Sequence, residues 1–152
     1  MIKISSTQIV KSKQILGLIQ ENIRGSDQIL KATSTLILTH IVQSFASNGL
    51  DFRFVGVDIQ TIYDNFEKCI VTDPLTATYS VGLLTELLKQ ADSTLSMQIF
   101  NRYSNVNKVS LIQQLLDINK KKDDVKKVDG TNYGCPVIGF YDYPLVFLEK
   151  LN

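Results

Sequence analysis

Histidine, cysteine and paired carboxylates are the residue types in this chain that could carry out chemistry. His40 is the one histidine among 152 residues, and no cysteine or second histidine stands at metal-ligand spacing from it. Cys135 lies in a Gly-Cys-Pro turn, but a nucleophilic cysteine needs a histidine or a helix N-terminus beside it. The sequence therefore favours structural roles for both, a hydrogen-bonded histidine at the edge of a bundle and an unreactive thiol.

Three pairs of carboxylates also lie near one another in the sequence: Asp51 with Asp58, Asp123 with Asp124, and Glu86 with Asp92. Glycosidases and two-metal enzymes need acids that converge on a cleft. These acids instead fall in predicted loops or on solvated helix faces, where caps and surface charges account for them. We expect no catalytic residue, no metal site and no cofactor.

Two segments have features in common with nucleotide-binding or nucleic-acid-binding motifs. Gly130, Gly134 and Gly139 lack the preceding apolar strand and the lysine-serine ending of a phosphate-binding loop. The stretch 96–116 can be drawn as a helix-turn-helix, with Asn107 and Lys108 toward the bases. Because 16 basic and 15 acidic residues leave a net charge of only +1, ordinary bundle helices are favoured over DNA binding.

The elements that must position any site are mainly helices. Apolar spacing and capping signals predict six of them, over about residues 6–24, 27–47, 58–71, 74–91, 94–103 and 105–119. Asp73-Pro74 is the strongest start signal. The wide apolar face of the second helix, built on Leu30, Ile37 and Ile41, predicts a central, largely buried helix. Gly82 predicts a close helix crossing.

A short strand is predicted over residues 52–57, which alternate and are rich in strand formers. Its partner would be residues 2–4 or 137–140, because a strand needs a neighbour for its backbone groups. The expected fold is thus mainly α: a single-domain bundle of five to six helices with a small two- or three-stranded sheet and an extended aromatic tail. The expected divisions are a helical domain 1–119, a charged linker 120–131 and a docking tail 132–152.

Composition sets limits on the class of protein. With 44% hydrophobic and 20% charged residues, the chain resembles an ordinary soluble domain, and neither a signal peptide nor a membrane span is recognisable. Cys69 and Cys135 are read as free thiols, with a disulfide left open. The expected location is the cytoplasm, or a particle assembled there.

The tail is the feature that points to a function. It concentrates aromatic residues behind the lysine-rich run 120–127, and the candidate partner-binding residues are Tyr133, Phe140, Tyr141, Tyr143 and Phe147. Aromatic side chains bury a large area at low entropic cost, and Pro136 and Pro144 stiffen the segment. The sequence therefore predicts a non-catalytic structural or assembly subunit that self-associates or docks on larger protein partners. By analogy of shape alone, phage head–tail connectors and ring-type virion proteins are comparable.

Two other classes of function remain open from the sequence. One is a small regulatory or inhibitory protein that binds one macromolecule, a protein in preference to DNA. The other is an enzyme whose residues converge only in the folded chain. No membrane partner is expected.

Overall fold

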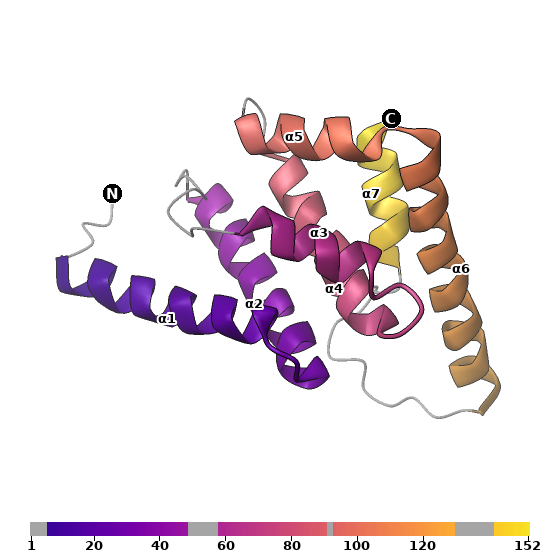
Figure 1. Ribbon diagram of the computed structural model, residues 1–152, viewed down its shortest axis with the longest axis horizontal. Coiled ribbons are helices and arrows are strands. Elements are labelled where there is room, and N and C mark those ends of the chain that lie inside the picture. Colours follow the sequence, from indigo (N-terminus) through magenta and orange to yellow (C-terminus); the bar gives the residue numbers. More distant parts are fainter. Residues whose placement is uncertain (1–5, 49–57, 91–92, 130–141) are drawn as a thin grey trace.

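The helices begin largely where the sequence signals them (Figure 1). The computed structural model describes residues 6–48, 58–90, 93–129 and 142–152, with the backbone alone for 6–10, 12 and 123–129. Over these residues seven helices occur and no strand does: α1 (Ser6–Arg24), α2 (Gln28–Ser47), α3 (Ile59–Glu67), α4 (Pro74–Leu88), α5 (Thr94–Tyr103), α6 (Val106–Asp129) and α7 (Tyr143–Leu151). The mainly α class is confirmed. The segments of the expected sheet, 2–4, 52–57 and 137–140, lie outside the described residues.

Side-chain caps satisfy backbone amides at the starts of four of the described helices, α2, α4, α5 and α6. The Asp27 carboxylate accepts a hydrogen bond from the Leu30 amide at 3.0 Å before α2. Asp73 does the same for Thr76 at 3.3 Å before α4, whose first turn carries Pro74. Each such cap satisfies an amide that has no partner within its helix, which contributes about 1 kcal/mol. The predicted starts of α2 and α4 are confirmed.

Helix α4 is the centre of the fold. It packs against α2, α3, α5, α6 and α7, and 11 of its 15 residues are buried. Its buried hydroxyls are satisfied locally: Thr78 donates to the Pro74 carbonyl at 2.7 Å and Thr85 to the Val81 carbonyl at 2.8 Å. Since a buried hydroxyl without a partner is costly, these bonds let Ser and Thr sit in the core.

The prediction that α2 is the central, largely buried helix is wrong, because α4 holds the centre and one side of α2 is exposed. One side of α2, including Leu38 and Val42, is fully buried against its neighbours. The opposite side is open: Leu30 and Ile37 remain 47% and 43% exposed. A wide apolar face predicts burial, but apolar residues on the outer side of a helix produce the same pattern.

The extended tail is also a wrong prediction for residues 143–151, which form α7. Pro144 occupies the first turn of α7, where its missing N–H is no loss, and Phe147 and Leu151 lie one turn apart on the buried side. The sequence predicts that the prolines of the tail stiffen an extended segment, whereas Pro144 stands in the first turn of a helix. This helix raises the number in the described residues above the five or six expected.

The charged linker 120–131 does not start at residue 120 as a solvated loop, because α6 continues to Asp129. Lysine is a good helix former, and Lys120 and Asp124 stand at the spacing at which opposite charges support a helix. Immediately before this stretch, the Asn119 side chain is buried and donates to the Thr78 hydroxyl at 2.9 Å. The boundary drawn after residue 119 therefore falls inside a helix that is fixed to α4.

Candidate functional site

The candidate partner-binding residues separate into two groups. Tyr133, Phe140 and Tyr141 lie outside the described residues, and their role stays a prediction. Phe147 has no exposed surface and packs inside the chain's own core. Tyr143 is half-buried against the backbone of α4 at Gly82. In this structure Tyr143 and Phe147 close the core of their own chain, and Phe147 offers no surface to a partner.

Gly82 confirms the predicted close crossing of two helices. A methyl group built on Gly82 would lie 2.6 Å from Cδ2 of Tyr143, well inside van der Waals contact. Only a residue without a side chain lets the Tyr143 ring approach α4 so closely. Gly82 thus permits the close approach of the aromatic start of α7 to α4.

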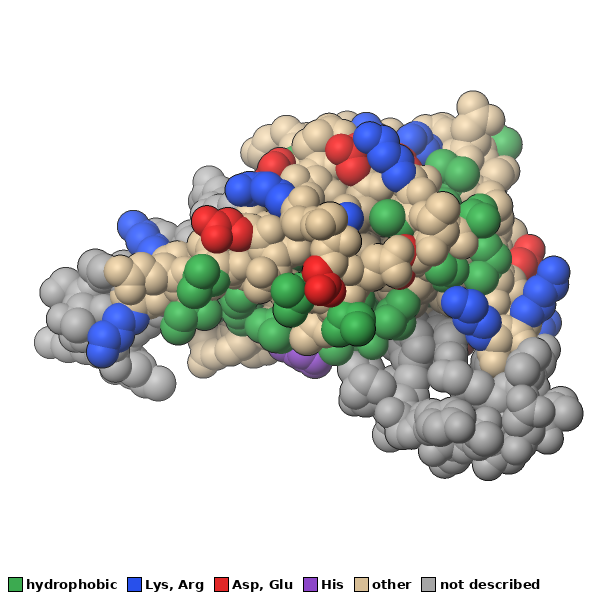
Figure 2. Space-filling view, turned by 60° about the horizontal axis from the view of Figure 1, so that its bottom comes forward, with side chains coloured by type: hydrophobic (Ala, Val, Ile, Leu, Met, Phe, Trp, Pro, Cys, Tyr) green, Lys and Arg blue, Asp and Glu red, His purple; other side chains and the backbone are tan. Residues whose placement is uncertain are grey.

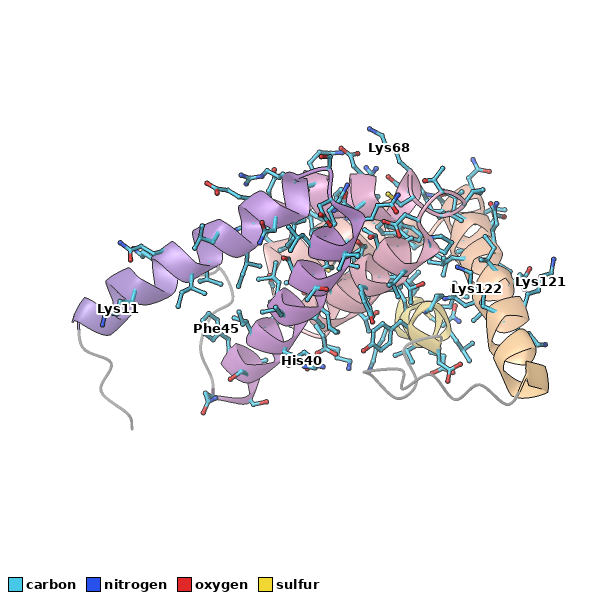
Figure 3. The ribbon with its side chains drawn as sticks, turned by 90° about the horizontal axis from the view of Figure 1, so that it is seen from below. Lys11, His40, Phe45, Lys68, Lys121 and Lys122 are labelled. Atoms are coloured by element: carbon cyan, nitrogen blue, oxygen red, sulfur yellow. The ribbon has the colours of Figure 1, made fainter. Side chains whose placement is uncertain are left out.

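The residues that could carry out chemistry do not converge. His40 is exposed on α2 (Figure 3). Cys69 is a free, half-buried thiol, and burial raises its pKa, an effect that the nearby Lys31 ammonium partly opposes. Cys135 lies outside the described residues. Among the residues that the structure describes, no group of three or more potential ligands is placed to hold a metal ion.

The described carboxylates of the predicted pairs have structural partners. Asp58 accepts a hydrogen bond from the Thr61 hydroxyl at 2.8 Å, which together with the nearby Arg24 keeps the pKa of this carboxyl below its usual value. Glu86 pairs with Lys89 at 3.1 Å within α4 and its C-cap. Asp51 and Asp92 lie outside the described residues, as do the side chains of the third pair.

An ionic cluster that the sequence did not reveal joins α3, α5 and α6. The Glu67 carboxylate accepts from Arg102 Nη2 at 2.5 Å and also binds the Lys108 ammonium. The Arg102 guanidinium lies over the ring of Tyr63, 4.3 Å from its centroid, where the ring quadrupole attracts the cation. Arg102 and Lys108 lie 35 and 41 positions after Glu67 in the sequence, a separation at which no local pattern signals a contact.

Tyr103 lies beneath this cluster and is fully buried. Burial, reinforced by the negative charge of Glu67, raises the pKa of its hydroxyl, so the hydroxyl stays protonated at neutral pH. The Arg102 guanidinium partly opposes this rise in pKa, but the hydroxyl has no hydrogen-bond partner. A buried, protonated tyrosine is neither a nucleophile nor a base, so the cluster fits a structural tie.

The same cluster weakens the DNA-binding alternative. The helix-turn-helix alternative places Lys108 toward the bases, and Arg102 is a second cation close by, in the last turn of α5. Both instead pair with the Glu67 carboxylate, and their side chains are only 27% and 32% exposed. A recognition helix needs its cations free for the phosphates and bases.

The most unusual surface in the described part of the chain is the outer face of α2. Six exposed residues form it, with no charged residue among them: Leu30, Thr33, Ile37, His40, Ser44 and Ser47. We call this set the uncharged face. The one charged residue within α2, Lys31, lies on another side, close to Cys69. The uncharged face therefore runs nearly the whole length of a 20-residue helix.

Helices α1 and α6 show what an ordinary solvated face of this molecule looks like. Helix α1 exposes Lys11, Lys13 and Glu21, and α6 exposes Lys120 to Lys122. Figure 3, seen from below, shows α2 crossing in front of α4 with His40 and Phe45 on it, while the labelled lysines lie on α1, at the end of α3 and on α6. In Figure 2, His40 borders hydrophobic side chains at the edge of the molecule.

An exposed face of this kind indicates contact with another surface. Leu30 and Ile37 expose nearly half of their surface there, and single exposed apolar residues are common. A continuous helix face without charge is not, because charged side chains keep a solvated helix soluble. Helix α2 is therefore the candidate interaction surface.

No helix within the described residues is long and apolar enough to cross a membrane. Comparison of the chain with protein-family models, with curated proteins and with solved structures found no match.

Proposed function

We propose that this protein is a non-catalytic assembly subunit that binds another protein chain through the uncharged face of α2. The proposal keeps the class of function that the sequence predicted and moves the contact from the aromatic tail to α2. Its action in the cytoplasm, or in a particle assembled there, is part of the same proposal.

A single observation carries it: the uncharged face is exposed although its helix is the one that packs most extensively on the central helix α4. A helix fixed in this way presents its outer residues in a rigid, pre-organised array, which lowers the entropic cost of binding. The apolar contact surface of a protein interface is depleted in charge, as this face is.

The aromatic tail is a candidate for a second contact region. Tyr133, Phe140 and Tyr141 stay candidates for a second contact, whereas Phe147 is occupied in the core. A subunit with two separate contact regions could join a larger assembly, as ring and connector proteins do. A regulatory protein would use one region only.

Photo-cross-linking in the source cells tests the proposal. Benzoylphenylalanine is placed at Ser44 on the uncharged face, and at Ser110 on α6 as the matched control, because both serines are exposed within helices. We expect a covalent adduct with a protein from position 44 and none from position 110. The absence of any protein adduct at position 44, in a normally folded variant, would overturn the proposal.

A further inference from the structure

The uncharged face has the residue spacing of a helix–helix seam. Its members follow one another at intervals of three, four, three, four and three residues: Leu30, Thr33, Ile37, His40, Ser44 and Ser47. This alternation is the one that keeps a stripe of residues facing a partner helix along its length. At 1.5 Å per residue, the 17 steps from Leu30 to Ser47 make a seam about 26 Å long.

The two ends of this seam differ in residue size. The larger aliphatic side chains, Leu30 and Ile37, occupy its N-terminal half, and the small Ser44 and Ser47 occupy its C-terminal half. A parallel, in-register pair of such helices would place large against large at one end and serine against serine at the other. The two helices would splay at one end and leave a gap at the opposite end.

Antiparallel pairing of the same face removes this mismatch. With the two-fold axis between Ile37 and His40, Leu30 lies opposite Ser47 of the second copy and Thr33 opposite Ser44 of the second copy. Ile37 then lies opposite His40 of the second copy. The two end layers then each combine Leu30 with Ser47 and are equal by symmetry, so neither end splays, and the central layer pairs Ile37 with the similarly sized His40.

The residues beside the seam fit the same partner. Ile29, Leu36 and Gln43 border one side, and Ile41 and Phe45 border the other, again without charge. A second copy brings an equally uncharged surface, so the contact buries no charged side chain and carries no cost of removing a charge from water. A partner with an ordinary charged helix face would bury such charges unpaired.

From these observations we infer that the uncharged face binds the same face of a second copy of this chain, in antiparallel orientation, to form a two-fold symmetric dimer. The inference rests on the proposed function and names the partner. It also fixes the register, which makes it testable residue by residue.

Two single-charge variants of the purified full chain test the register. Thr33→Asp and Ser44→Lys each place two unpaired charges in the dimer, and each variant alone should self-associate at least about 10-fold more weakly than the wild type. An equimolar mixture should recover association as a heterodimer, because Asp at position 33 then faces Lys at position 44 of the other chain. Sedimentation velocity from low to high micromolar concentration measures all three samples.

Ser110→Asp and Ser110→Lys are the matched controls, since they place the same charges on an exposed position of α6. Both should leave the sedimentation of the wild type unchanged. Helical content and melting temperature of every variant confirm that each chain is folded. A second pair on the same face, Leu30→Asp with Ser47→Lys, repeats the test in the two end layers.

The outcomes separate the inference from the proposed function. A wild-type mass of 17.1 kDa throughout the concentration range would overturn the dimer, and so would folded single variants that associate as well as the wild type. Monomeric variants whose mixture stays monomeric would overturn the antiparallel register. If photo-cross-linking at Ser44 still yields an adduct with a different protein, the proposed function stands without the dimer. If it yields no adduct, the proposed function fails independently.

Discussion

The ring of Tyr103 on α5 meets the ring of Phe147 on α7 edge to face, with centroids 5.5 Å apart and planes inclined by 77°. Tyr103 makes two further contacts of this kind, with Tyr63 and Phe66 on α3. The positive edge of one ring against the negative face of another adds about 0.5–1.5 kcal/mol per pair to the area buried. Tyr103 thus links a helix near the end of the chain to one from its middle.

Phe147→Ala should lower the free energy of unfolding by about 3–5 kcal/mol, because it empties a fully buried site beside Tyr103. Urea denaturation followed by circular dichroism measures the loss. Leu145→Ala, on the exposed side of the same helix, is the control and should cost less than about 1 kcal/mol. A Phe147→Ala chain with unchanged stability and lost association would return this residue to the intermolecular role that the sequence predicted.

Gly82→Ala should destabilise the protein by about 1–3 kcal/mol although alanine is the better helix former, because its methyl group would overlap the Tyr143 ring. Gly17→Ala provides the contrast, since no heavy atom lies within 4 Å of the added methyl group there. That variant should gain up to about 1 kcal/mol from helix propensity. The same thermal melts compare both, and equal gains would show that α7 does not lie on Gly82.

Glu67→Gln should cost about 1–3 kcal/mol of stability, because it leaves Arg102 and Lys108 half-buried without their shared counter-charge. The matched variant Glu86→Gln breaks a pair with Lys89 inside one helical turn and should cost less than about 0.5 kcal/mol. Chemical denaturation at low and at high salt measures both. Equal effects of the two substitutions would contradict the role of Glu67 as a tie between helices.

Alkaline pH should destabilise the fold through Tyr103. Burial raises the pKa of this hydroxyl in the folded chain above its ordinary value of 10.0. Below about pH 10 both states hold the proton and the buried neutral tyrosine contributes fully to stability. Above that pH the unfolded chain releases the proton while the folded chain keeps it, so stability falls as the pH rises.

Tyr103→Phe should therefore move the onset of alkaline unfolding to higher pH. Because the hydroxyl has no hydrogen-bond partner, the variant should differ from the wild type by less than about 1 kcal/mol at neutral pH. Burial also raises the pKa of the Tyr63 hydroxyl, so Tyr63→Phe should likewise move the onset of alkaline unfolding to higher pH. Titration with circular dichroism detects both, and an unchanged onset in the Tyr103 variant would contradict this assignment.

Local signals in the sequence carried much of the fold. Caps such as Asp27 and Asp73, the proline after Asp73 and the apolar spacing of α3 act within a few residues, so they predicted helix starts correctly. The misplaced centre of the fold has a physical cause. Apolar spacing shows that a helix has an apolar side but not which neighbour covers it, so α2 was placed at the centre instead of α4.

The contacts between distant residues were not predictable in this way. The cluster of Glu67, Arg102 and Lys108 depends on three helices meeting, and none of the three residues stands in a recognisable motif. The uncharged face could have been noticed, since α2 carries a single charge in 20 residues. Without the packing of α4 to show which side of α2 is outside, the lack of charged residues in α2 predicts that the helix is buried.

The central position of α4 also has a consequence for synthesis on the ribosome. Its neighbours α2 and α3 precede it in the chain, but α5, α6 and α7 follow it, and α7 ends 63 residues after Leu88. At about 5–20 residues per second, roughly 3–13 s separate the completion of α4 from that of α7. During this interval the nascent chain exposes the side of α4 that α7 later covers, including Gly82, and it is in this interval that a chaperone would find its binding site.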